Sequence, residues 1–256
     1  MKTEEMTMNK SPQTWRAKMK KLIESVWRAN LHLNKAGLTP LTWGNASQID
    51  RSRGLIAIKP SGVAYEKLRK EDIVLTDIKG IIIASRLRAS SDLPSHLALY
   101  RSFPSVGAVV HTHSAFATAF AQAGKPVPCL GTTQADYCPC QIPVTDPLTP
   151  SQIRTDYERQ TGEMIVKKIR QLKLAPAQCP FILTAQHGPF AWGRDAAQAV
   201  ENAIVLEYLC KMAFLTYVLK GKLKSIPQIL IEKHFFRKHG AHAYYGQEKV
   251  NPQSKI

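Results

Sequence analysis

The most constraining feature of this sequence is an apolar run that ends in two histidines, His111 and His113, within residues 107–114 (GAVVHTHS). A buried strand ending here would direct both imidazoles to one face, roughly 6.5–7 Å apart along the backbone, because side chains alternate with period two. This spacing suits two ligands of one metal ion, and neutral imidazole is a common zinc ligand. Histidines at a strand end are equally typical of hydrogen-bonded packing, so the pair alone leaves both interpretations open.

A third histidine, His187, follows a second apolar segment, residues 180–184, and precedes Gly188. Glycine allows the backbone to pass close to a bound group. Three histidines with one open coordination position are typical of a catalytic metal site. The sequence therefore predicts a metal site held by His111, His113 and His187.

Length and composition are those of one globular domain. The chain has 256 residues, 44% of them hydrophobic, which is enough for one sizeable core. We expect a tail over residues 1–13, a single domain over 14–247 and a second tail over 248–256. No apolar run approaches the roughly 18 to 20 residues of a membrane span, and the first residues lack the apolar core of a signal peptide. The predicted location is the cytoplasm, without membrane contact.

The net charge of +16 allows a different interpretation, a basic protein that binds nucleic acid or another polyanion. Much of the excess falls on patterns typical of helices or just beyond one, where solvated charge is the usual explanation. These residues are Arg16, Lys18, Lys20, Lys21, Lys167, Lys168, Arg170, Lys173, Lys220, Lys222 and Lys224. A basic surface also attracts small anions such as a sugar phosphate, so nucleic acid is not the partner we predict.

The five cysteines do not form a disulfide framework, because their number is odd and they are scattered along the chain. Reduced thiols are the simpler interpretation. Only Cys138 and Cys140 are close in sequence, separated by Pro139. They are two ordinary loop thiols or an auxiliary metal or redox pair.

Hydrophobic periodicity and turn residues predict a mixture of long helices and short strands, which indicates an α/β or α+β fold. Helices are expected over 14–34, 96–103, 114–123, 151–172 and 195–219, and strands over 45–50, 55–59, 73–76, 81–84, 106–111 and around 182. Pro94 stands at a helix start, and Ser114 and Ser151 are the expected N-caps.

Two glycine-containing motifs could contact an anion. The first is residues 42–45 (TWGN), with Gly44 and Asn45, and the second is residues 59–63 (KPSGV), with Lys59, Ser61 and Gly62. Glycine lets backbone amides approach an anion, and the amide, ammonium and hydroxyl groups can donate to phosphate oxygens. Each motif taken alone is equally an ordinary turn.

Two further polar motifs contain an acid. Ser90 and Ser91 could donate to a phosphate, and Asp92 could join the metal or orient its ligands, although the same triplet is a common helix cap. In residues 131–137 (GTTQADY), Asp136 lies in a loop without an obvious helix to cap. Such an acid can act as a general acid/base if its surroundings raise its pKa toward neutrality.

These motifs together resemble the class II sugar-phosphate aldolase/epimerase family, and its epimerases in particular. The resemblance runs in order from about Leu22 to Gln247 and includes residues 187–193 (HGPFAWG) and 238–247 (KHGAHAYYGQ). It implies a single-domain fold with a central, mostly antiparallel sheet flanked by helices on both faces. It also implies a homotetramer with the site at a subunit interface.

The resemblance assigns site residues by position in this sequence. The zinc ligands would be His111, His113 and His187, with Asp92 as the acidic partner; Mn2+ or another divalent ion would also suit these ligands. Substrate contacts would be Gly44, Asn45, Ser61, Gly62, Ser90 and Ser91, with Lys59 as an additional anion contact. The acid/base pair would be Asp136 and Tyr245, and Tyr245 would reach the site of a neighbouring subunit.

The implied reaction interconverts L-ribulose 5-phosphate and D-xylulose 5-phosphate by cleaving C3–C4 and re-forming it on the other face of the aldehyde. The alternative is a class II aldolase that acts on L-fuculose phosphate. Related aldolases have a glutamate acid/base where this chain has Asp92, and the shorter carboxylate favours epimerisation. Gln134, where such epimerases usually have histidine, and Cys138 with Cys140 depart from the family pattern.

Overall fold

The computed structural model describes residues 15–17, 19–222, 224–239 and 243–244. Its centre is a seven-stranded sheet in the order β4-β3-β2-β1-β5-β7-β6, in which every neighbouring pair is antiparallel. The strands are β1 (Asn45–Asp50), β2 (Leu55–Ile58), β3 (Val74–Asp77), β4 (Ile82–Ala84), β5 (Ala108–His111), β6 (Phe181–Leu183) and β7 (Pro189–Gly193). The predicted α/β fold with a mostly antiparallel sheet is confirmed.

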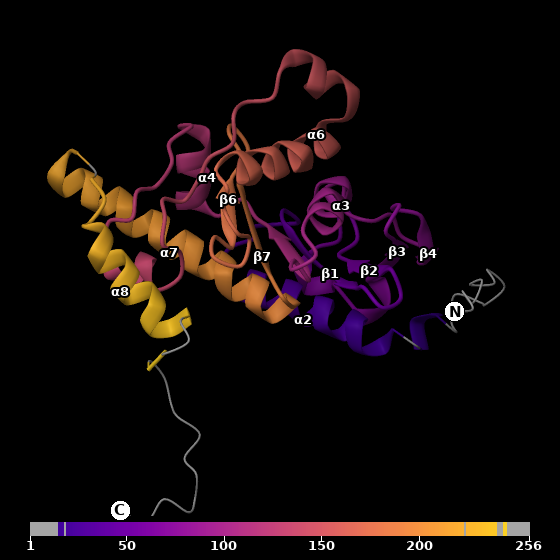
Figure 1. Cartoon of the computed structure of the whole chain (residues 1–256). Helices are drawn as coiled ribbons and strands as arrows, with labels where there is room; N and C mark the ends of the chain where they lie inside the picture. Colours follow the sequence, from indigo (N-terminus) through magenta and orange to yellow (C-terminus); the bar gives the residue numbers. More distant parts are fainter. Residues whose placement is uncertain (1–14, 18, 223, 240–242, 245–256) are drawn as a thin grey trace, which may run out of the picture.

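Helices cover both faces of this sheet (Figure 1). On one face lie α3 (Leu93–Ser102) and α6 (Pro150–Gln171); on the other lie α2 (Lys20–Lys35), α4 (Ala115–Gln122) and α7 (Ala196–Lys220). The short helices η1 (Tyr65–Lys67), η2 (Lys70–Asp72) and α5 (Thr132–Ala135) lie in connections, and α8 (Gln228–His239) packs on α5.

Successive side chains of β5 point to opposite faces of the sheet, and this alternation determines where the first histidine lies. Ala108 and Val110 pack in the core beneath α2, α4 and α7, whereas Val109 packs in the core beneath α3 and α6. His111, two residues after Val109, therefore points to the α3/α6 face. There it stacks on Phe190 of β7, with ring centroids 4.3 Å apart.

Most predicted elements are present; one predicted N-cap residue is wrong, and another is correct in position but does not cap through its side chain. Helix α6 begins after Thr149 rather than Ser151, because Thr149 and Gln152 form a reciprocal capping box. Ser114 occupies the N-cap position of α4, but its side chain makes no capping hydrogen bond. The carboxylate of Glu207 on α7 instead accepts from the backbone amides of Phe116 and Ala117, both at 2.9 Å.

Five elements in the described part of the chain were not predicted: the short helices η1, η2 and α5, the strand β7 and the helix α8. The segment of β7 is only five residues long and includes a proline and a glycine, which normally argue against a strand. It nevertheless forms a fully buried strand, because it pairs with β5 on one side and with β6 on the other.

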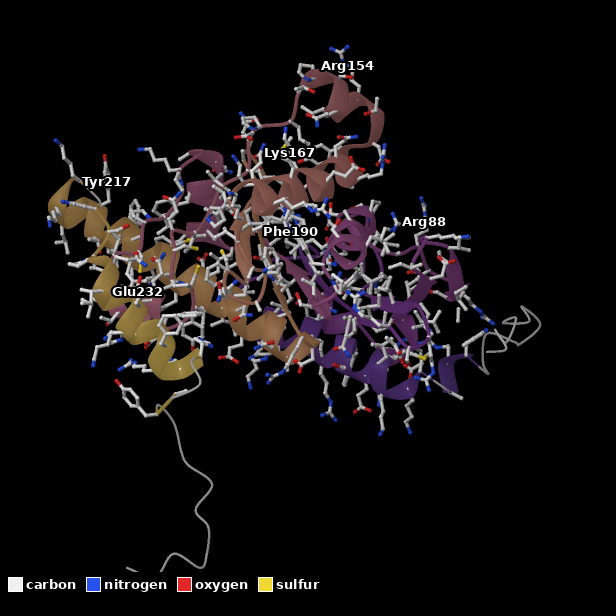
Figure 2. The ribbon with its side chains drawn as sticks, viewed as in Figure 1. Arg88, Arg154, Lys167, Phe190, Tyr217 and Glu232 are labelled. Carbon is white, nitrogen blue, oxygen red and sulfur yellow. The ribbon has the colours of Figure 1, made fainter. Side chains whose placement is uncertain are left out.

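Among the described residues, α7 alone is long and apolar enough to span a membrane by length and composition. Its first half packs on β7, β5 and α2, and Ala199, Ala203 and Leu206 are buried in that core. This half is therefore a core helix, whereas its last turns carry exposed apolar side chains. Figure 2 shows Phe190 in the interior and Tyr217 projecting from the end of α7.

Candidate metal and substrate site

The three predicted histidine ligands come together at one end of the sheet. Their ligating nitrogens all lie within 4.8 Å of one another, and His111 Nε2 is 3.1 Å from His113 Nε2. His111 is the last residue of β5, and His113 follows the strand. His187 lies in the turn between β6 and β7, beside β5 because β7 pairs with β5.

The hydrogen bonds of these rings suit a bound metal ion. His111 Nδ1 lies 3.0 Å from the carbonyl oxygen of Pro189, and donation there leaves Nε2 with its lone pair directed at His113. Two unprotonated nitrogens 3.1 Å apart repel each other unless a proton or a cation lies between them. His187 Nδ1 is buried and has no hydrogen-bond partner among the residues that the structure describes. The three histidines therefore fit a divalent metal with His₃ ligation.

The turn that carries His187 is rigid. Thr184 Oγ1 donates to the carbonyl oxygen of Gly188 at 2.6 Å, and the amide of His187 donates to the carbonyl oxygen of Thr184 at 3.1 Å. Gln186 has a φ of +62°, a left-handed conformation uncommon for residues other than glycine. A Cβ on Gly188 would lie 2.8 Å from the carbonyl oxygen of Thr112, so this glycine permits contact with the end of β5.

Asp92 lies beside the histidines, held by groups from the polar motifs. Its Oδ2 accepts from Asn45 Nδ2 at 2.6 Å and lies 3.4 Å from Ser90 Oγ, while Asn45 also donates to Ser90 at 3.0 Å. Burial raises the pKa of Asp92. The neighbouring histidines His111, His96 and His187 and the hydrogen bond from Asn45 together lower this pKa by a larger amount, so the net shift is downward. A carboxylate oriented in this way can contact a metal or fix its ligands.

The motif at residues 59–62 forms the adjoining wall. The amide of Ser90 donates to the Lys59 carbonyl oxygen at 3.0 Å, and the amide of Ser61 donates to the Arg88 carbonyl oxygen at 3.0 Å. Ser61 and Gly62 are exposed, as is Ser91 on the facing loop. The two loops are thus joined by backbone pairing and leave donor groups open to solvent.

Lys59 is unusual because its side chain is almost entirely buried, with 1% of the residue exposed. Its ammonium lies 4.7 Å from the centre of the Tyr65 ring and 3.4 Å from two carbonyl oxygens, those of Thr42 and Pro60. Burial lowers the pKa of Lys59 from 10.5 to about 8. A buried ammonium with only carbonyl and ring contacts is suited to receiving an anion.

Gly44 is required by sterics. Its φ is +75°, and a Cβ there would lie 2.8 Å from the carbonyl oxygen of His111. The hydroxyl of Tyr65 donates to the Gly44 carbonyl oxygen at 2.8 Å. This fixes the loop before β1 against the metal-bearing strand.

Sequence reasoning did not select two aromatic residues that flank the histidines. The ring of Trp43 is 5.9 Å from that of His113, and the ring of Tyr157 on α6 is 5.8 Å from that of His187. Tyr157, Thr184 and His187 also line a small cavity of about 110 Å³. Trp43 lies within a predicted motif, but Tyr157 carries no signal beyond its helical position.

Asp136 does not join the histidines in its own chain. It shares a cavity with Trp192, Gly193 and Arg194 at the far end of β7, and the four residue steps from Pro189 to Gly193 span about 13 Å. There its carboxylate accepts from Arg237 at 2.7 Å and lies 3.1 Å from His234 Nδ1, both on α8. Tyr245 lies outside the described residues.

The surroundings of Asp136 do not make it a raised-pKa acid in the isolated chain. Burial raises the pKa of Asp136, but hydrogen bonds from Arg237 and His234 and the charge of Lys238 outweigh it, so the net shift is downward. This is the opposite of the direction expected for an acid with a pKa near neutrality.

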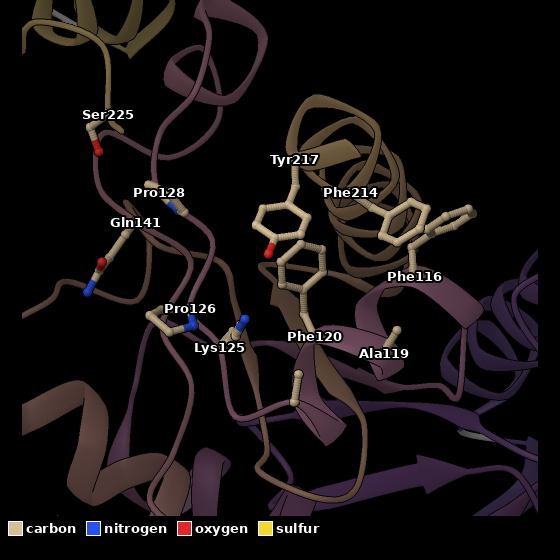
Figure 3. Close-up of a pocket in the computed structure, with 11 residues that line it drawn as sticks. Phe116, Ala119, Phe120, Lys125, Pro126, Pro128, Gln141, Phe214, Tyr217 and Ser225 are labelled. Atoms are coloured by element: carbon tan, nitrogen blue, oxygen red, sulfur yellow. The ribbon is translucent and has the colours of Figure 1, made fainter. Parts of the chain in front are cut away.

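A large apolar hollow lies apart from the histidines. It is a cavity of about 670 Å³ lined mainly by aromatic, alanine and proline side chains, among them Phe116, Phe120, Phe214 and Tyr217 (Figure 3). Its walls come from α4, the connection that follows and the last turns of α7.

The sheet order and the histidine cluster define a class of protein. Residues 24–214 match the family described as Class II Aldolase and Adducin N-terminal domain, and the chain belongs to this family. Among solved structures, an L-fuculose 1-phosphate aldolase superposes with a TM-score of 0.70 and 23% identity, covering 84% of this chain and 94% of that one. A putative aldolase/epimerase/decarboxylase, YgbL of Klebsiella pneumoniae, superposes with a TM-score of 0.66 and 21% identity, covering 84% and 97%. These two likenesses concern the fold alone.

Curated relatives narrow the class. The chain is 49% identical over 230 residues to the L-ribulose-5-phosphate 4-epimerase UlaF of Salmonella paratyphi B (strain ATCC BAA-1250 / SPB7), which covers 90% of this chain and 100% of the relative. The protein of the same name from Salmonella typhi matches with the same identity and coverage. The epimerase branch that the motifs resemble is thus the branch in which these relatives lie.

Proposed function

We propose that this chain is a metal-dependent epimerase that interconverts L-ribulose 5-phosphate and D-xylulose 5-phosphate. The observation that carries the proposal is the cluster of His111, His113 and His187 beside the Asn45-bound carboxylate of Asp92. The names of the relatives, at 49% identity over their full length, give the same reaction. An aspartate at position 92, rather than the longer glutamate, favours the epimerase over an aldolase.

The proposed metal ligands are the three histidines, with Asp92 as their acidic partner and zinc as the ion. A bound divalent ion would supply Lewis-acid polarisation of the ketose oxygens. His111 is held in one orientation by Pro189 and Phe190, so its ligating nitrogen is already directed at the site before binding. Imidazole ligands with a carboxylate suit zinc well, although manganese also accepts them.

The phosphate and hydroxyl groups of the substrate would bind the neighbouring loops. Asn45, Ser61, Ser90 and Ser91 offer amide or hydroxyl donors, Gly44 and Gly62 allow close backbone approach, and Lys59 adds a positive charge. The paired loops keep these donors at fixed positions, which orients the sugar relative to the histidines. The +16 net charge favours arrival of an anionic substrate.

The acid/base groups would come from an adjacent subunit. Asp136 lies at the opposite end of β7 from the histidines, so it can serve a site only if a second copy is present. We propose that Asp136 and Tyr245 exchange protons with the two faces of the aldehyde in a homotetramer. Desolvation at the subunit contact would raise the pKa of Asp136 from the lowered value it has in the single chain.

The apolar end of α7 supports an oligomer. Tyr208, Phe214, Leu215, Val218 and Leu219 are exposed from the middle of this helix to its end, and Phe214 also lines the 670 Å³ cavity. Exposed apolar side chains grouped on one element favour a protein contact. We also propose that residues 14–247 form one domain, which the single seven-stranded sheet supports. The proposed location of the protein is the cytoplasm.

The deciding experiment is a coupled assay of metal-reconstituted protein on L-ribulose 5-phosphate. D-xylulose 5-phosphate and free glycolaldehyde phosphate are measured together. We expect epimer with negligible free aldehyde. Stoichiometric aldehyde would show an aldolase instead, and tight, salt-dependent nucleic-acid binding that survives loss of His111 would show a polyanion-binding protein.

A further inference from the structure

Two neighbouring cysteines and a third that is distant in sequence meet at the end of the sheet opposite the histidines. Cys138 and Cys140 follow α5, and Cys179 lies two residues before β6. Their Sγ atoms all lie within 4.8 Å of one another, and those of Cys138 and Cys140 are 3.3 Å apart. Cys138 and Cys179 are fully buried, while Cys140 is partly exposed.

This spacing matches a thiolate metal site. Sulfur atoms bound to one zinc ion at about 2.3 Å lie about 3.8 Å apart in tetrahedral geometry. The observed sulfur positions therefore need to move by only a few tenths of an ångström to about 1 Å around a common ion. The other buried cysteines, Cys129 and Cys210, have no such cluster in the described part of the chain.

The cluster is braced by the surrounding backbone. Gln134 Nε2 donates to the carbonyl oxygen of Cys140 at 3.1 Å, and the amide of Cys138 donates to the carbonyl oxygen of Gln134 at 2.8 Å. Gln134 and the two cysteines are the departures from the family pattern. The structure joins them into one unit.

We propose that Cys138, Cys140 and Cys179 form a second metal site, which takes a thiophilic cation such as Zn2+. Each cysteine releases its proton to solvent on binding, and the partly exposed side of Cys140 leaves a fourth position for water or another small ligand.

Such an ion would join the Asp136 loop to the start of β6. Asp136 is two residues before Cys138, with Tyr137 between the two. The ammonium of Lys238, on α8, lies 4.8 Å from the centre of the Tyr137 ring. The site would thus hold the segment that carries the proposed acid/base. It would do so without touching the histidine cluster.

The test uses Co2+ as a spectroscopic probe on the full chain, reduced and stripped of metal with a chelator. Thiolate ligation gives a near-ultraviolet sulfur-to-cobalt charge-transfer band, which imidazole and carboxylate ligands do not produce. We expect two Co2+ per chain and this band in the wild type. We expect the band to survive in His113→Ala, which loses the other site.

The matched variants are Cys140→Ala, which removes the partly exposed ligand, and Cys210→Ala, which removes a buried thiol outside the cluster. Cys140→Ala should lose the band and one Co2+ per chain, with an unchanged far-ultraviolet circular dichroism spectrum, while Cys210→Ala should keep both. In the His113→Ala background, Zn2+ should raise the Tm only when Cys140 is present. A single Co2+ per chain without the band in reduced wild type would overturn the proposal. Because this readout does not depend on turnover, it is independent of the reaction assigned above.

Discussion

The two ends of the β6–β7 hairpin carry different chemistry. At the turn, His111, His113 and His187 converge with open donor loops nearby, and in the described part of the chain a buried nitrogen of His187 has no partner. At the other end, Asp136 is bound by Arg237 and His234, and three thiols pack together. The first end is prepared to bind a ligand, whereas the carboxylate of the second is already occupied. This difference is consistent with the proposal above, in which one chain supplies the binding half of a site and Asp136 supplies the proton-transfer half to a neighbouring subunit.

Removing a ligand at the turn should have the largest effect. His113→Ala should lose the bound metal and lower kcat/KM by on the order of 10³-fold or more, because the metal contributes several kcal/mol to the transition state. His113 lies beyond the end of β5 and is partly exposed, so the fold should survive. Metal content and circular dichroism measure both. Full metal occupancy in this variant would remove His113 from the ligand set.

Asp136→Asn tests the opposite end. It should keep its metal and lower kcat on the order of 10²-fold, which is the usual contribution of a positioned acid/base. The isosteric amide can accept one of the two hydrogen bonds from Arg237 and loses the other, so the negative charge is removed with little change in side-chain volume. Unchanged turnover would show that Asp136 only anchors α8.

Mixing these two variants tests whether the two halves meet between subunits. A His113→Ala chain retains Asp136, and an Asp136→Asn chain retains all three histidines, so a contact between them can restore one complete site. We expect partial activity in verified mixed oligomers. Mixed oligomers as inactive as either parent would place both halves within one chain.

Asn45→Ala should have an intermediate effect. It removes the donor that orients Asp92 and Ser90, and loss of such an outer contact costs roughly 10–100-fold in metal affinity or activity. Metal titration and steady-state kinetics measure the two contributions. Asn34→Ala is a suitable control, because Asn34 donates to the Thr39 carbonyl oxygen away from Asp92. Equal effects of both changes would point to general destabilisation.

The two ends also differ in how far the sequence predicted them. The strand β1 was predicted with its observed bounds, and the histidine motifs were found because each lies in a short polar string at the end of an apolar run. The meeting of Cys179 with Cys138 was not found, because it depends on the segment around Val144 lying beside β6, a backbone pairing that was not predicted. Helix α8 was missed because only Ile231 and Phe235 on it are buried, too few for a clear apolar periodicity. Its pairing with Asp136 was missed with it.

The smallest expected effect is the pH dependence of substrate binding that Lys59 would cause. Lys59 has its pKa lowered by burial to about 8, against 10.5 when exposed. Between these values the unfolded chain holds a proton that the folded chain has lost, so this residue makes folding stability rise with pH across that window. A bound phosphate favours the protonated form of Lys59, so the substrate should bind best below about pH 8. In the wild type, KM should rise above that pH. In Lys59→Met, KM should be about tenfold higher and should vary less with pH, because one charge-assisted hydrogen bond is missing. Identical KM profiles of the two proteins would show that the Lys59 ammonium does not contact the substrate. Its role would then be to hold the loop before β1 through its contacts with the carbonyl oxygens of Thr42 and Pro60.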